Sequence, residues 1–310
     1  MHEKRHLPLI LTCLFLAAAA CGCSATKSVL EKMSPKALAE KVMPAKYGLK
    51  KQVLVIPLAD EAGIGETEIY RINEMFVQQL KKSPRLVVYK LSGRLPLLGD
   101  ELPGRTAGIT DPDLLRKVRK LDMNALVAGS VNPVETRTKK GPFWTWPFRK
   151  VYTVYEVTTE VTVVDVASGT LLLSRRETEK VSLRREEARD RDPKEVMAAV
   201  LKKAVSGMLQ RHARAIDKKL AAEPWTGRIL SMENGEITIN AGSKVGVHPG
   251  QVFNVFAPGD RIVCKDGKTL TVLGKKIGAI KITRVMEKSA VASPVAKADF
   301  SAGLVVRERP

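Results

Sequence analysis

Residues 52–59 (QVLVIPLA) form a continuous apolar run that is rich in valine and isoleucine. Such a run is typical of a strand that is buried on both faces of a sheet. Residues 124–131 (NALVAGSV) repeat this pattern. Between the two runs, apolar residues recur at three- and four-residue steps over residues 66–82, which predicts an amphipathic helix. A strand at residues 86–91 and a second helix capped by Asp111 complete an alternating α/β pattern.

The periodicity changes to two from Val151 onward, where apolar and polar residues alternate. This alternation predicts a long half-exposed strand. Ser168 and Gly169 turn the strand into a partner over residues 170–183, so we expect an extended antiparallel hairpin.

The segment 184–192 is a dense run of charge in which acids alternate with arginines. We interpret it as a solvated connection whose charges neutralise one another, and not as a metal site. A helix capped by Asp192 then runs to about residue 223. Beyond it, short strands and frequent turns such as Asn234-Gly235 predict a small barrel or sandwich. The predicted fold is a mixed α/β domain with an extended hairpin, plus a C-terminal all-β barrel of the SH3-like type.

The first residues are typical of a secretory signal: a positive start, an apolar stretch over residues 7–16, and four alanines before Cys21. The layout resembles a lipobox, whose cysteine becomes the lipidated first residue of the mature protein. Cys21 is the predicted site, and Cys23 is the alternative. The apolar stretch is shorter than the ~20 residues that span a bilayer. An ordinary cleaved signal with incidental cysteines is the other interpretation.

The formal net charge of +19 has to be interpreted together with the compartment to which this signal would direct the protein. In a cytosolic protein, such a surplus would indicate nucleic acid. An exported protein instead meets lipid head groups, lipopolysaccharide and cell-wall polymers. Neither Cys21 nor Cys23 is followed by aspartate, which is compatible with sorting to the outer membrane. We therefore expect a lipid-anchored protein that faces the periplasm and has no nucleic-acid partner.

No catalytic motif is found in the chain. The sequence has no phosphate-binding loop, no nucleophile elbow and no zinc-protease signature. His212 and His248 are isolated and are interpreted as packing or surface residues. Cys264 is a lone thiol that we expect to be buried and inert. The prediction is a protein that is not an enzyme and binds no cofactor or metal.

An unusual aromatic segment interrupts the chain before the long strand. Its residues Phe143, Trp144, Trp146 and Phe148 are flanked by lysine and arginine. Aromatic side chains settle at bilayer interfaces, and neighbouring cations favour anionic head groups. The segment is therefore a candidate for membrane contact. A hairpin tip packed on its own domain or on a partner subunit is the alternative.

This first part of the chain resembles the curli secretion component CsgG. The resemblance rests on the strand at residues 53–58 (VLVIPL), the amphipathic helix, the strand at residues 125–131 and the turn at residues 165–169 (DVASG). Similar domains occur in the TolB N-terminal region, the flagellar lipoprotein FlgO and the penicillin-binding-protein activator LpoB. The stretch at residues 171–183 departs from the curli pore, whose subunits each insert two long apolar hairpins. It carries charges such as Arg175, Arg176 and Glu177, and a lipid-facing strand tolerates each only at a cost of about 2–4 kcal/mol near the midplane.

The C-terminal part resembles the C-terminal domain of flagellar assembly protein T. This resemblance rests on four motifs: TGRIL at residues 226–230, INAGSKVG at 239–246, GQVF at 250–253 and GAIKI at 278–282. Their glycines suit tight turns between barrel strands, where φ is positive.

The predicted organisation is a signal peptide (residues 1–20), a lipid anchor and linker (21–49), a CsgG-like domain (50–223) and a flagellar-assembly-like barrel (224–310). The resemblances imply a non-enzymatic structural or assembly factor of the flagellum or of an envelope secretion machine. Its expected partners are the membrane, envelope proteins and further copies of itself. An oligomeric secretion channel and a regulator of a cell-wall synthase are the alternative functions.

Overall fold

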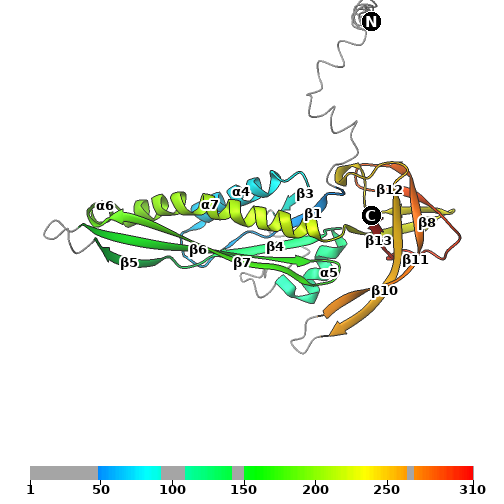
Figure 1. Cartoon of the computed structure of the whole chain (residues 1–310), viewed down its shortest axis with the longest axis horizontal. Helices are drawn as coiled ribbons and strands as arrows, with labels where there is room; N and C mark the ends of the chain where they lie inside the picture. The colour runs from blue at the N-terminus through cyan, green and yellow to red at the C-terminus, as the bar shows by residue number, and fades with distance from the viewer. Residues whose placement is uncertain (1–47, 92–108, 142–149, 264–268, 310) are drawn as a thin grey trace, which may run out of the picture. The chain divides into compact units, whose positions relative to one another are not determined.

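A mixed seven-stranded sheet organises the first part of the chain in the computed structural model, which describes residues 48–91, 109–141, 150–263 and 269–309 (Figure 1). Its elements are β1 (Lys51–Val55), β2 (Ala59–Asp60), α4 (Glu66–Lys81), β3 (Leu86–Lys90), α5 (Pro112–Lys120), β4 (Ala125–Val131), β5 (Glu135–Lys140), β6 (Val151–Asp165), β7 (Leu171–Arg184), α6 (Arg185–Arg189) and α7 (Pro193–Ala222).

The parallel half of the sheet contains β1, β2, β3 and β4. The single strand predicted over residues 52–59 is divided in the structure, since β1 ends at Val55 and β2 starts at Ala59. Pro57 lies in the gap and has no N–H to donate to a neighbouring strand. The backbone N–H of Leu58 instead donates to Asn73 Oδ1 of α4 at 2.7 Å.

The antiparallel half is built around β6. Along one edge, β6 pairs first with β5 and then with β4, and along the other edge it pairs with β7. The predicted hairpin of residues 151–183 is thereby confirmed. Strand β5 was not predicted, because its sequence ETRTKK has no apolar residue and all six residues are exposed. The segment predicted as a solvated connection contains the short helix α6, and its charged side chains are exposed.

Helices cover the two faces of the sheet unequally (Figure 1). Helices α4 and α7 pack on one face, over a core that includes Phe76, Val157 and Met208. The short helix α5 packs on the other face, over a smaller core that includes Leu126 and Val164. The sheet is therefore buried on both faces only near its parallel half.

A closed barrel of six antiparallel strands follows α7, in the order β10-β11-β12-β9-β8-β13. Its elements are β8 (Thr226–Glu233), β9 (Glu236–Ile239), the 3₁₀ turn η4 (Ser243–Val245), β10 (Val252–Val263), β11 (Thr269–Val285), β12 (Ala290–Pro294) and β13 (Val305–Glu308). The mixed α/β fold followed by a small barrel is thereby confirmed. Asn234 and Gly235 both have positive φ, at 51° and 80°, as a two-residue hairpin turn requires.

Strands β10 and β11 are longer than predicted. They remain paired over residues 258–263 and 269–273, which we call the hairpin extension. Sequence periodicity missed this part because Pro258, Gly259 and Gly274 interrupt the alternation. The register also shifts at three places along the pair.

The glycines of the barrel motifs meet two different requirements. Gly246 and Gly250 have φ values of 96° and 85°, which side chains disfavour, as expected for turns. Gly242 has an ordinary φ, but a Cβ atom there would lie 2.2 Å from the carbonyl oxygen of Met286. Glycine at 242 is therefore required by the close approach of two backbones.

We predict that Gly242→Ala lowers the free energy of unfolding by about 1–3 kcal/mol, because the added methyl group forces the two backbones apart. Gly207→Ala is the matched control, since its methyl would meet only the Arg211 side chain, at 3.4 Å, within α7. The control should raise the same free energy by about 0.5–1 kcal/mol. Urea denaturation measures both, and a Gly242→Ala variant as stable as the wild type would contradict the prediction.

Candidate functional site

The candidate lipidation and membrane-contact residues and the lone thiol Cys264 lie outside the described ranges. Cys21 and Cys23 precede residue 48, Phe143, Trp144, Trp146 and Phe148 fall within 142–149, and Cys264 falls within 264–268. The roles predicted for them stay predictions. The structure does describe the strands on either side of the aromatic segment.

Strands β5 and β6 bring the two ends of that segment together. The backbone N–H of Gly141 donates to the carbonyl oxygen of Lys150 at 2.8 Å. We call the strands that lead to this point, residues 135–141, 150–158 and 178–184, the arm. Five cationic side chains gather at its end by strand register: Lys139, Lys140, Lys150, Arg184 and Arg185. All five are exposed, and none of them forms an ion pair with another described residue.

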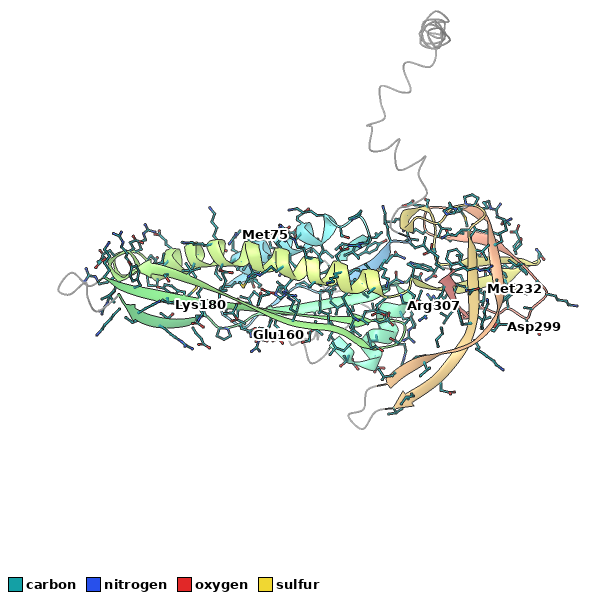
Figure 2. All side chains as sticks on the ribbon, in the orientation of Figure 1. Met75, Glu160, Lys180, Met232, Asp299 and Arg307 are labelled. Atoms are coloured by element: carbon teal, nitrogen blue, oxygen red, sulfur yellow. The ribbon has the colours of Figure 1, made fainter. Side chains whose placement is uncertain are left out.

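Two cations of β7, in contrast, are paired across the hairpin. Lys180 lies opposite Glu156 and binds it at 2.8 Å, and Arg176 lies opposite Glu160 at 3.3 Å. Glu160 and Lys180 are labelled in Figure 2. The hydrogen bond from Lys180 lowers the pKa of Glu156 below its ordinary value. On this surface of the hairpin, opposite charges therefore pair between the two strands.

Helix α7 fixes the hairpin through Arg211 and His212. Arg211 donates to both Glu177, at 2.5 Å, and Glu179, at 2.9 Å, which are neighbours on one side of β7. His212 is fully buried, and its Nε2 lies 2.9 Å from Thr159 Oγ1 of β6. Burial lowers the pKa of His212 to about 4, so the imidazole is neutral at physiological pH. The sequence-based interpretation of His212 as a packing residue agrees with this position.

Most of the exposed large apolar side chains belong to the barrel. Ten large apolar side chains are exposed in the described ranges. Two of them, Tyr70 and Leu171, belong to the α/β part, and the other eight lie in the barrel strands and their connections. They are Leu230, Met232, Ile262, Val263, Val272, Ile277, Met286 and Val295. Ile262 and Val263 belong to the hairpin extension and are 51% and 70% exposed. Clusters of exposed apolar residues often mark protein-binding surfaces.

Two further kinds of site were considered. In the part of the chain that the structure describes, no three histidine, cysteine or acidic residues lie close enough together to hold a metal ion. None of the helices in that part has the length and apolar character needed to cross a membrane.

Comparison with known families gives a match to one part of the chain. Residues 234–300 match the family model of the flagellar assembly protein T C-terminal domain. Three of the four motifs that suggested this resemblance lie inside the match, and TGRIL at 226–230 precedes it. A search of curated proteins returns no match.

Solved structures show only a distant likeness. The hypothetical protein CT253 from Chlamydia trachomatis is 14% identical and aligns over 56% of this chain and 96% of its own, with a TM-score of 0.32. Lipoprotein GNA1162 from Neisseria meningitidis is 14% identical over 56% and 99% of the two chains, with a TM-score of 0.31. The PelC dodecamer from Paraburkholderia phytofirmans is 15% identical over 55% and 92%, with a TM-score of 0.28. The resemblance of the α/β part to CsgG stays a prediction.

We predict that wild-type stability falls as the pH is lowered from about 6.5 toward 4. In this pH window the histidine binds a proton in the unfolded chain, whereas buried His212 stays neutral in the folded chain. The unfolded state therefore binds more protons, and the free energy of unfolding decreases as the pH falls. His212→Gln should flatten this slope, as measured by urea denaturation at pH 7 and pH 5. The exposed His248 provides the control, because His248→Gln keeps the buried imidazole and hence the slope. A His212→Gln variant with the wild-type slope would refute the assignment.

Proposed function

We propose that this chain is a non-enzymatic lipoprotein of the outer membrane that acts in the periplasm as an assembly factor of the flagellum. The observation that carries the proposal is the match of residues 234–300 to the flagellar assembly protein T C-terminal domain. The signal and lipobox-like pattern before Cys21 supports export and lipid anchoring. The charge of +19 fits a protein that works close to anionic envelope surfaces.

In this proposal the two parts of the body have different tasks. The barrel docks a protein partner through the hairpin extension, where apolar side chains are exposed although the barrel is closed without them. The α/β part docks to envelope components or to further copies of the chain. The unpaired cations at the end of the arm favour an anionic surface there, such as the lipid head groups proposed as the contact of the aromatic segment.

The anchor is tested by metabolic labelling with palmitate. Wild type should incorporate the label and sediment with membranes, because the acyl chain is attached to the new N-terminal cysteine. Cys21→Ala should lose both properties if Cys21 is acylated, and Cys23→Ala if Cys23 is. Cys264→Ala is the control and should keep the label. A wild-type protein without label would contradict acylation.

Docking through the hairpin extension is tested by motility. In a strain that lacks the gene, wild type should restore swimming in soft agar, and the double variant Ile262→Ser, Val263→Ser should restore it poorly. The two side chains contribute little to the barrel core, so the protein level should stay normal. Tyr70→Ser removes a similarly exposed apolar side chain from α4, 62% exposed, and should swim like wild type. Full swimming of the double variant would exclude this surface as the docking site.

A further inference from the structure

The end of the arm, where β5, β6, β7 and α6 come together in Figure 1, carries cations on both faces of the sheet. Lys139 and Arg184 both lie opposite Tyr152 in register, one on each side of it, so all three share the face opposite α7. Lys140, the next residue of β5, points to the other face. The cations therefore surround the end of the arm instead of following one face.

The charge of this surface is not balanced by nearby acids. The acids of the strands lie further along the arm, such as Glu156, which binds Lys180 at 2.8 Å. Residues 139–141, 150–152 and 183–190 contain six cations and three acids, and these acids lie within α6 or directly after it. The end of the arm thus has a surplus of three positive charges, which is located at the strand ends.

This arrangement of cations fits a flat anionic surface that meets the arm end-on. The long stems of lysine and arginine let cations from both faces of the sheet reach the same plane. A linear polyanion would need a row of cations along one groove or face, whereas Lys139 and Lys140 point to opposite faces. Tyr152 is partly exposed beside two of the cations, and tyrosine is enriched at the boundary between bilayer and water.

We propose that the end of the arm binds the anionic phospholipid head groups of a bilayer end-on, as a membrane contact that does not need the acyl chain. The inference rests on the proposed function for its location, since it presupposes a chain exported to the periplasmic face of a membrane. Anionic head groups attract lysine and arginine within a Debye length of the surface. A basic patch of this kind strengthens the membrane binding of a lipid-anchored protein.

The experiment uses the chain from residue 21 with Cys21→Ala and Cys23→Ala, which we call the parent chain, so that no acyl group contributes to binding. Co-sedimentation measures its partition coefficient on vesicles of phosphatidylcholine alone and on vesicles that also contain about 30% phosphatidylglycerol. The parent chain should bind the anionic vesicles at least about tenfold more tightly than the neutral ones. Raising sodium chloride from about 0.05 M to about 0.5 M should remove this preference, because the Debye length becomes shorter.

Two variants of the parent chain locate the contact. The arm variant Lys139→Gln, Lys140→Gln, Lys150→Gln should bind the anionic vesicles at least about tenfold more weakly, because three unpaired cations are lost. The variant Arg184→Gln, Arg185→Gln removes the cations of β7 and α6 and should also weaken binding. This second variant keeps the test decisive if the lysine variant fails to fold.

The matched control removes the same number of charges from exposed lysines of the barrel: Lys275→Gln, Lys276→Gln, Lys288→Gln. Two of these lysines are neighbours on a strand and the third lies outside the strands, as in the arm, and none forms an ion pair with a described residue. Binding of the control to the anionic vesicles should stay within about twofold of the parent chain.

Four results would each overturn the proposal. They are equal binding of the parent chain to both kinds of vesicle, a preference that persists at high salt, equal losses in the arm variant and the control, and a linear polyphosphate whose binding needs the arm lysines as much as that of the vesicles does. Failure of vesicle binding would leave palmitate labelling of the anchor intact. Failure of labelling would leave vesicle binding measurable, because the parent chain has no acyl group.

Discussion

Strand β6 must pair with three other strands while keeping one face against α7, and the rest of the α/β part follows from this constraint. Its buried residues Tyr155, Val157, Thr159, Val161 and Val163 are all odd-numbered and lie on the side of the main core. On the opposite face burial begins only near the end of the strand, at Thr162 and Val164, where α5 covers the sheet. Along the rest of the strand, even positions such as Glu156 and Glu160 remain open to cations from β7.

This one-sided cover explains why a densely charged strand is stable here. In a sheet covered on both faces, the alternating charges of β7 would be desolvated, at a cost that ion pairs seldom recover. Arg176 and Lys180 stay hydrated on the open face and contribute modestly through cross-strand pairs. Glu177 and Glu179 lie instead on the side of α7, where Arg211 binds both. The side chain of Glu177 is only 12% exposed. Burial alone would raise the pKa of Glu177, but hydrogen bonds from Arg211 and Arg175 more than compensate and lower it.

The sequence predicted the elements whose burial is periodic and failed where pairing occurs without burial. Helices α4, α5 and α7 and strands β3, β4, β6 and β7 were predicted within a few residues, because each has a distinct apolar face. Strand β5 and the hairpin extension are held by backbone hydrogen bonds, which leave no apolar signature. The cations at the end of the arm could be predicted only in part. Lys139, Lys140 and Lys150 flank the aromatic segment in the sequence, but Arg184 and Arg185 join them only through strand register.

The contacts of Asp122 place two demands on a single position. Its backbone follows α5 with φ at 59°, a conformation that glycine and asparagine tolerate best. Its carboxylate meanwhile holds Arg228 and Asn240 from the barrel. Glycine would relieve the backbone but release both barrel residues, and a longer acid would keep the charge but fit the left-handed backbone poorly. Aspartate is thus the compromise that serves both demands, and the residue that ends a small surface helix also joins the α/β part to the barrel.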